Sequence, residues 1–191
     1  MLTRESYLNR LMREVLAPML EQVKPGSTAT IDTWRVSVGF PGGGSARKRI
    51  GECWSDKASS AGLTEMFISP ILESASEVDH VLLHEMIHAA VGTSEGHKGP
   101  FKALARAVGL TGKMTATTAS EELRERLHAT IADTLGAYPH ARLNLGASGV
   151  KKQTTRMIKA ECMDCGYTFR TAQKWIDTGL PTCVCGGEFN V

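Results

Sequence analysis

The sequence predicts an α+β protein whose helices pack on a short sheet of three or more strands, followed by a C-terminal zinc ribbon. Apolar periodicity and helix start and stop signals mark four helices, and three short strand-like runs lie between the first two. Four of the five cysteines fall in the last thirty residues, in two close pairs. A chain of 191 residues has room for one ordinary domain and such an appendage.

The first helix is expected over residues 3–23, where apolar side chains recur at helical spacing. Pro18 predicts a kink within this helix, and the sequence Lys24-Pro25-Gly26 ends it. The expected strands follow at residues 34–40, 50–54 and 64–69.

Three more helices are expected after the strands. The capping box Ser74-Ala75-Ser76-Glu77 opens a helix that Gly92 ends. Further helices are expected over residues 100–108 and 120–135, each followed by a glycine. These signals predict a domain over residues 1–143, a polar linker over residues 144–155 and the zinc ribbon over residues 156–191.

The bulk composition is that of a globular protein. Hydrophobic residues make up 42% of the chain, and a net charge of +2 is too small to indicate nucleic-acid binding by itself. The odd number of cysteines and their close pairing favour metal binding in a reducing compartment. The charged N-terminus and the short apolar runs predict a cytoplasmic protein without a membrane span.

The sequence HEMIH at positions 84–88 predicts a metal site on the second helix. Residues four apart share one helix face, so His84 and His88 can reach one ion. Glu85 is rotated about 100° from His84, beside the metal, where a base can take a proton from water. His97 can supply the third ligand of a catalytic zinc ion if the chain turns back after Gly92.

The alternative is an HExxH sequence that occurs by chance on a helix surface. The capping box, the stop at Gly92 and a third histidine in a glycine-flanked turn favour the zinc site. His80 and His128 are expected to be solvated surface histidines. The strand over residues 65–69 is expected to form the sheet edge that borders the cleft, where an extended peptide could add by main-chain hydrogen bonds.

The C-terminal cysteines form a CxxC pair, Cys162 and Cys165, and a shorter CxC pair, Cys183 and Cys185. Four thiolates without a histidine predict a closed structural zinc site, on which so small a module depends for folding. A redox dithiol at the first pair is the alternative, but it leaves the second pair unexplained. The chain is thus expected to bind two zinc ions. Cys53, in a strand pattern, is expected to be a buried thiol.

Positive charge gathers around the start of the ribbon. The cationic residues over positions 142–174 are Arg142, Lys151, Lys152, Arg156, Lys159, Arg170 and Lys174, opposed by Glu161 and Asp164. Tyr167, Phe169 and Trp175 are interleaved with them. Cationic groups follow a phosphate backbone and exposed aromatic rings stack on bases, so this segment predicts contacts to nucleic acid. The alternative is a solvated basic face with aromatic side chains packed around the zinc ion.

The motif His84-Glu85-Met86-Ile87-His88, followed by Gly96-His97-Lys98-Gly99-Pro100-Phe101, resembles the SprT-like zinc metallopeptidase family. The order of helix and strands ahead of the motif and the C-terminal cysteine pairs resemble that family too. The similarity covers most of the chain, from about residue 4 to the end. The third histidine follows the second by nine residues, whereas the metzincin family places it six residues on.

The resemblance implies a small zincin-type metallopeptidase of gluzincin-like build, with three histidine ligands and Glu85 as general acid and base. It also implies an activity like that of the Spartan and Wss-type proteases, which digest proteins crosslinked to DNA and are activated by DNA. The chain departs from the family pattern in its CxC pair and in a long insertion over residues 111–145. Tyr138 and His140 in that insertion are candidates for stabilising the oxyanion, with surface packing as the alternative.

The sequence thus predicts a zinc-dependent endopeptidase that acts on DNA-associated or DNA-crosslinked proteins and docks on nucleic acid through its ribbon. One alternative is a nucleic-acid-binding or transcription-associated zinc protein with a non-catalytic peptidase-like domain, against which the intact Glu85 argues. Another is a peptidase for one dedicated regulator, with the ribbon used for protein contact.

Overall fold

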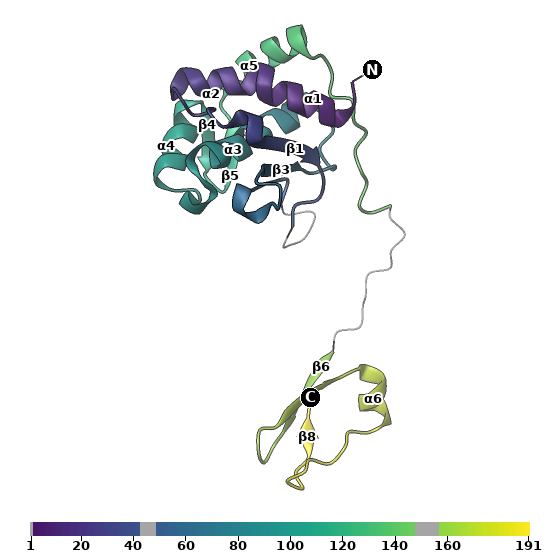
Figure 1. Ribbon diagram of the computed structural model, residues 1–191. Helices are drawn as coiled ribbons and strands as arrows, with labels where there is room; N and C mark the ends of the chain where they lie inside the picture. The colour runs from purple at the N-terminus through teal and green to yellow at the C-terminus, as the bar shows by residue number, and fades with distance from the viewer. Residues whose placement is uncertain (1, 43–48, 148–156) are drawn as a thin grey trace. The chain divides into compact units, whose positions relative to one another are not determined.

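The computed structural model describes residues 2–42, 49–147 and 157–191 (Figure 1). They form two compact units, Met1–Leu145 and Gly146–Val191. The expected linker, residues 144–155, lies largely outside the described residues. Among the residues described, no helix combines the length and the apolar character that crossing a bilayer requires.

The N-terminal helix consists of α1 (Arg4–Arg10), a π-helical segment (Leu11–Leu16) and α2 (Ala17–Val23). The helix predicted over residues 3–23 is therefore confirmed. Its irregularity is a wider turn just before Pro18, in which the amide of Ala17 donates to the carbonyl of Met12, five residues back. A proline ring clashes with the carbonyl four residues before it, and the wider turn relieves that crowding.

Three strands form the sheet of the N-terminal unit: β1 (Trp34–Val38), β2 (Gly51–Trp54) and β3 (Thr64–Ile68). Their order is β1-β3-β2, with β3 parallel to β1 and antiparallel to β2. The expectation that the strand over residues 65–69 forms the sheet edge is therefore wrong. Both sides of β3 are hydrogen-bonded, and the outer strand beside the pocket described below is β2.

The central element of this unit is α3 (Ala75–Val91), which contacts β2, β3, the N-terminal helix and the elements that follow it (Figure 1). Ser74 and Glu77 form the predicted capping box, and Gly92 ends the helix with a φ of 95°. Its fully buried apolar side chains join those of the N-terminal helix and the sheet in one core; on α3 they are Val78, Leu82, Leu83, Met86 and Ile87.

The remaining α-helices and strands described in the N-terminal unit are α4 (Gly99–Ala107), a hairpin of β4 (Leu110–Lys113) and β5 (Ala116–Ala119), and α5 (Glu121–Thr134). Sequence patterns do not predict the hairpin, because its strands are short and rich in threonine and glycine rather than large apolar residues. The expected insertion over residues 111–145 is not peripheral. Leu123, Leu127 and Ile131 of α5 belong to the core.

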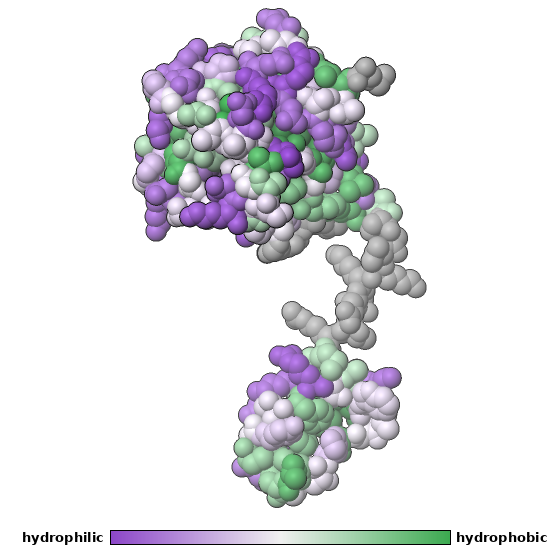
Figure 2. All heavy atoms as spheres, in the orientation of Figure 1, coloured by the Kyte–Doolittle hydropathy of each residue, from purple (hydrophilic) through white to green (hydrophobic). Residues whose placement is uncertain are grey.

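The C-terminal unit contains β6 (Ile158–Cys162), β7 (Thr168–Thr171), α6 (Gln173–Thr178) and β8 (Phe189–Asn190). The strands form a sheet in the order β7-β6-β8, and Phe169 packs on Phe189 with ring centroids 4.8 Å apart. This core is small, and Figure 2 shows hydrophobic residues at the surface of the unit. Met163, Trp175 and Val184 are exposed there.

Replacing Leu127 with alanine tests whether α5 is part of the core. Leu127 is fully buried, so we expect Leu127→Ala to lower the free energy of unfolding by about 2–5 kcal/mol. The measurement is urea denaturation followed by circular dichroism. Glu122→Ala, on the exposed face of the same helix, should change stability by no more than about 0.5 kcal/mol. Equal effects of the two changes would contradict a core role for α5.

Candidate active site and metal centres

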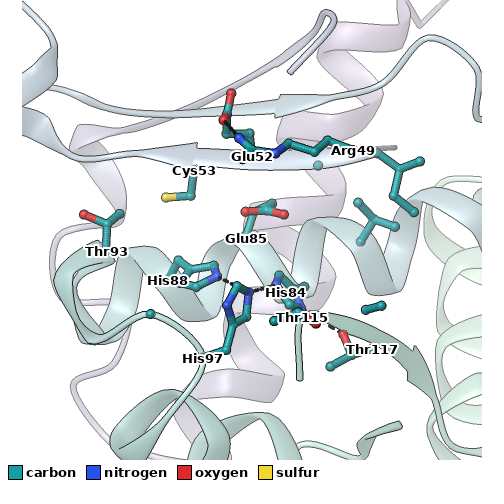
Figure 3. Close-up of a pocket in the computed structure, with 15 residues that line it drawn as sticks. Arg49, Glu52, Cys53, His84, Glu85, His88, Thr93, His97, Thr115 and Thr117 are labelled. Atoms are coloured by element: carbon teal, nitrogen blue, oxygen red, sulfur yellow. Dashed lines mark hydrogen bonds and ion pairs between the residues drawn. The ribbon is translucent and has the colours of Figure 1, made fainter. Parts of the chain in front are cut away.

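Three histidines converge at one end of a pocket. His84 and His88 lie on one face of α3 because they are four residues apart (Figure 3). Gly92 and Gly96, with φ of 95° and 57°, turn the following chain so that His97 reaches the same point. Nε2 of His97 lies 3.2 Å from Nε2 of His84 and 3.2 Å from Nε2 of His88.

These nitrogens fit a zinc ion. The three ligand atoms lie within 4.8 Å of one another. A tetrahedral site with Zn–N bonds of about 2.0–2.1 Å places its ligand nitrogens about 3.3 Å apart. The fully buried Phe101 stacks on His88 with ring centroids 4.3 Å apart and packs edge-on against the other two rings. One side chain of α4 thus supports all three imidazoles.

Burial keeps the histidines in the form that binds metal. It lowers the pKa of His84 to about 3, with a further contribution from the neighbouring histidines. Burial, and then the charge of His97, lowers the pKa of His88 to about 4, and burial lowers that of His97. All three imidazoles are therefore neutral at pH 7, as ligands must be.

Glu85 lies between α3 and the backbone of β2 (Figure 3). Gly51 covers it so closely that a Cβ at that position would stand 2.5 Å from Oε1 of Glu85 and 2.8 Å from Cγ1 of Val81. Burial, and then the carboxylate of Glu52, raises the pKa of Glu85 to about 8. A carboxyl with a pKa near the working pH can both accept and return a proton.

The pocket around these groups has a volume of about 560 Å³. One wall is β2 with the residues just before it, and the other includes the turn and start of β5 in the hairpin. Arg49 pairs with Glu52 at 2.7 Å on the first wall. Cys53 is half-buried there, so the expectation of a buried thiol holds in part. Burial, and then the charge of Glu85, raises the pKa of Cys53 to about 12, so the thiol stays protonated.

Tyr138 and His140 lie away from this pocket, and the expectation that they stabilise an oxyanion is not supported. Tyr138 is buried against Tyr7, with ring centroids 5.2 Å apart. Nε2 of His140 lies 2.9 Å from the carbonyl oxygen of Pro70. Both side chains serve packing between elements, and neither lines the histidine pocket.

The other two histidines have different surroundings. His128 is exposed, as predicted. His80 is half-buried rather than solvated. Its Nδ1 lies 3.0 Å from the carbonyl oxygen of Ser76 and 3.1 Å from Oδ1 of Asp79. His80 is not part of the converging group.

The four C-terminal cysteines form a second cluster. Sγ of Cys162 lies 3.5 Å from that of Cys185, and Sγ of Cys165 lies 3.5 Å from that of Cys183. A tetrahedral zinc site with Zn–S bonds of about 2.3 Å has sulfurs about 3.8 Å apart, so the cluster fits zinc. The CxC pair converges with the first pair because Gly186, with a φ of 91°, makes the turn. Amide hydrogen bonds, led by that of Cys165, lower the pKa of the Cys162 thiol to about 7.

The structure describes three of the six cationic residues predicted to contact nucleic acid, which are Lys159, Arg170 and Lys174. Lys151, Lys152 and Arg156 lie outside the described residues. In the ribbon, Lys159 pairs with Glu161, Arg170 donates to the carbonyl of Met157, and Nζ of Lys174 lies 4.5 Å from the ring centroid of Trp175. Tyr167 and Trp175 are exposed, whereas Phe169 packs in the small core.

A model of the SprT-like family matches residues 16–130, which is more than half of the chain. The match includes the three histidines, the hairpin and most of α5. Residues 111–130 therefore belong to the family pattern, and the expected insertion is wrong over that part. No curated protein and no solved structure matches the chain.

Glu85→Gln tests the burial of the carboxyl in the metal-free protein. The pKa of Glu85 rises from its ordinary value of 4.5 to about 8 in the fold, so between these values the folded state holds a proton that the unfolded state has lost. Stability therefore falls as pH rises through this window. We expect the metal-free variant to gain stability over wild type as pH rises, by about 2–4 kcal/mol at pH 8.

The measurement is urea denaturation of both chelator-treated proteins from pH 5 to pH 8. Both proteins retain the histidines, so their difference isolates Glu85. A difference that does not change with pH would contradict a raised pKa.

Gly187→Ala tests the cysteine site. A Cβ at Gly187 would stand 2.8 Å from Sγ of Cys162 and 2.5 Å from Oδ2 of Asp164. The aspartate side chain can move, but the sulfur would have to leave the ligand set. We expect zinc per chain, measured after dialysis against a weak chelator, to fall from two to one. Val184→Ala, at a fully exposed position in the same turn, should retain two. Two zinc ions in both variants would show that the sulfur has room to move.

Proposed function

This chain belongs to the SprT-like family, and on that premise we propose that it is a zinc-dependent endopeptidase of the zincin type. The observation that carries the proposal is the convergence of three Nε2 atoms beside a buried carboxyl group on the same helix. A closed structural site would not need a buried proton acceptor next to its ligands.

The proposed roles follow from the positions of the side chains. His84, His88 and His97 would hold zinc through Nε2. A zinc ion held there would polarise the carbonyl of the scissile amide and lower the pKa of water. Glu85 takes a proton from the attacking water and delivers it to the leaving amine as the C–N bond breaks. The backbone of β2 restricts access of bulk water to Glu85, which supports this proton transfer.

The substrate would bind in extended form along β2. β2 is one of the two outer strands of the sheet and the one that lines the pocket, which supports pairing of its outer side with a peptide backbone. In this proposal β2 has the role that the sequence pattern predicts for residues 65–69. The hairpin wall opposite β2 would limit the side chains that enter the pocket.

We propose DNA-associated or DNA-crosslinked proteins as the substrate class, with the ribbon docking on nucleic acid. Exposed Tyr167 and Trp175 support the proposal, since aromatic rings stack on unpaired bases. The charge of the ribbon supports it less, because residues 157–191 carry three lysine and arginine residues against four carboxylates. Phosphate contacts would therefore rest mainly on Lys151, Lys152 and Arg156, which precede it in the sequence.

The same charge balance favours a second role for the ribbon, as a protein-contact module that selects the substrate. Met163 and Val184 expose apolar surface beside the cysteine cluster, as such a module would.

Unpaired thiolate ligands persist in a reducing compartment, which supports the cytoplasmic location that we propose.

Proteolysis of a DNA-binding protein, with and without single-stranded DNA, tests the proposed function. We expect wild type to cleave and Glu85→Gln to lose at least about 100-fold in rate, because the general base is lost. Glu122→Gln, which removes one exposed carboxylate from α5, should cleave like wild type. Cleavage is followed by gel electrophoresis.

DNA dependence separates the two roles of the ribbon. Stimulation by DNA that weakens with salt and is reduced in Trp175→Ala supports docking on nucleic acid. Cleavage at the same rate with and without DNA supports the protein-contact role. No cleavage by a chain that binds two zinc ions would favour the non-catalytic alternative or a single dedicated substrate.

A further inference from the structure

We infer that Thr117 is a positioning residue for His84: its hydroxyl accepts a hydrogen bond from Nδ1–H of that imidazole and so directs Nε2 toward the metal. The inference rests on the proposed zinc site and deepens it. It assigns a role to the hairpin of β4 and β5, an element that sequence patterns do not predict.

The contact is short and links distant parts of the chain. Oγ1 of Thr117 lies 2.8 Å from Nδ1 of His84, across 33 positions in sequence (Figure 3). Nε2 of the same ring lies 3.2 Å from Nε2 of His97. The ring therefore presents one nitrogen to the hairpin and the other to the ligand cluster.

This arrangement selects one tautomer of His84. A neutral imidazole carries a proton on one nitrogen and a lone pair on the other. If Nε2 is to give its lone pair to a metal, Nδ1 must hold the proton, and a hydroxyl oxygen can accept a hydrogen bond from it. Thr117 thus favours the tautomer and the ring orientation that binding requires.

The hairpin fixes the direction in which Thr117 points. Alternate residues of a strand face the same side, so Thr117 points inward with the buried Ala119, while Ala116 and Thr118 are exposed. Ala119 pairs with the buried Leu110 at the base of the hairpin. Threonine is branched at Cβ, which restricts its rotamers and limits the positions of the hydroxyl.

The other two histidines are held differently. In the described part of the chain, no side chain or carbonyl makes a comparable hydrogen bond to Nδ1 of His88 or His97. Those rings are supported by Phe101, with centroids 4.3 and 5.0 Å from the phenyl ring. Thr117 is therefore expected to influence the ligand set through His84 alone, and its loss should weaken metal binding without abolishing it.

The test is the zinc affinity of the full chain carrying Thr117→Val, which removes the hydroxyl and retains the shape of the side chain. Removal of a hydrogen-bond partner of a ligand typically weakens metal binding about 10- to 100-fold. We expect this loss at the histidine site, measured by competition with a chromophoric chelator, and no change at the cysteine site of the same molecule. Cobalt substitution adds a spectroscopic readout, since the absorption bands of the histidine site should shift and the sulfur-to-metal bands should not.

Two variants control for effects on folding. Thr118→Val makes the same chemical change on the exposed face of the same strand and should bind zinc like wild type. Thr117→Ser keeps the hydroxyl and should restore most of the affinity that Thr117→Val loses. If serine and valine weaken binding equally, the hydroxyl is not the cause and the inference is overturned.

The outcomes separate this inference from the proposed function. Wild type with two zinc ions, and Thr117→Val with unchanged affinity and cobalt spectrum, overturns the role of Thr117 and leaves the zinc site standing. Wild type with zinc only at the cysteines overturns the proposed function, and the inference with it. Selective weakening in Thr117→Val, with rescue by serine, supports both.

Discussion

The burial of α3 is the constraint on which the rest of the N-terminal unit depends. This helix contributes fully buried residues such as Leu82 and Met86 to the core, yet it also carries His84, Glu85 and His88. Polar groups are costly to bury unless each has a partner or a neutral form. The penalty is reduced here because the imidazoles that converge on one point are neutral, and because the pKa of Glu85 is raised to about 8, which favours its neutral form.

Residues that stabilise the N-terminal unit also hold the side chains of the histidine site in position. Phe101 is a core residue of α4 and also the surface against which the histidine rings lie. β2 closes the sheet and covers Glu85, which requires a glycine at position 51. α5 and the hairpin strand β5 also contact α3, and the hairpin in addition reaches His84 directly through Thr117.

The two candidate metal centres differ in how they are assembled. The histidine cluster is held in place by a large apolar core that includes residues of the N-terminal helix, of β1 and β3, and of α3, α4 and α5. The ribbon has a small core around Phe169 and Phe189, and its turns are drawn together at four cysteines. A metal ion bound at the histidines would therefore add chemistry to a fold that its own core stabilises. One bound at the cysteines would supply much of the free energy of folding, as in other small zinc modules.

The sequence by itself determined the features that are local. Helical spacing places His84 and His88 on one face, Ser74 and Gly92 bound their helix, and the clustered cysteines indicate a second site. Only the tertiary structure decided what depends on long-range contacts. Strand order put β2, rather than β3, at the sheet edge beside the pocket, packing put Tyr138 in the core, and the hairpin brought Thr117 to His84. Periodicity reports which face of an element is apolar, but pairing between strands and contacts across 33 positions depend on how the elements pack together.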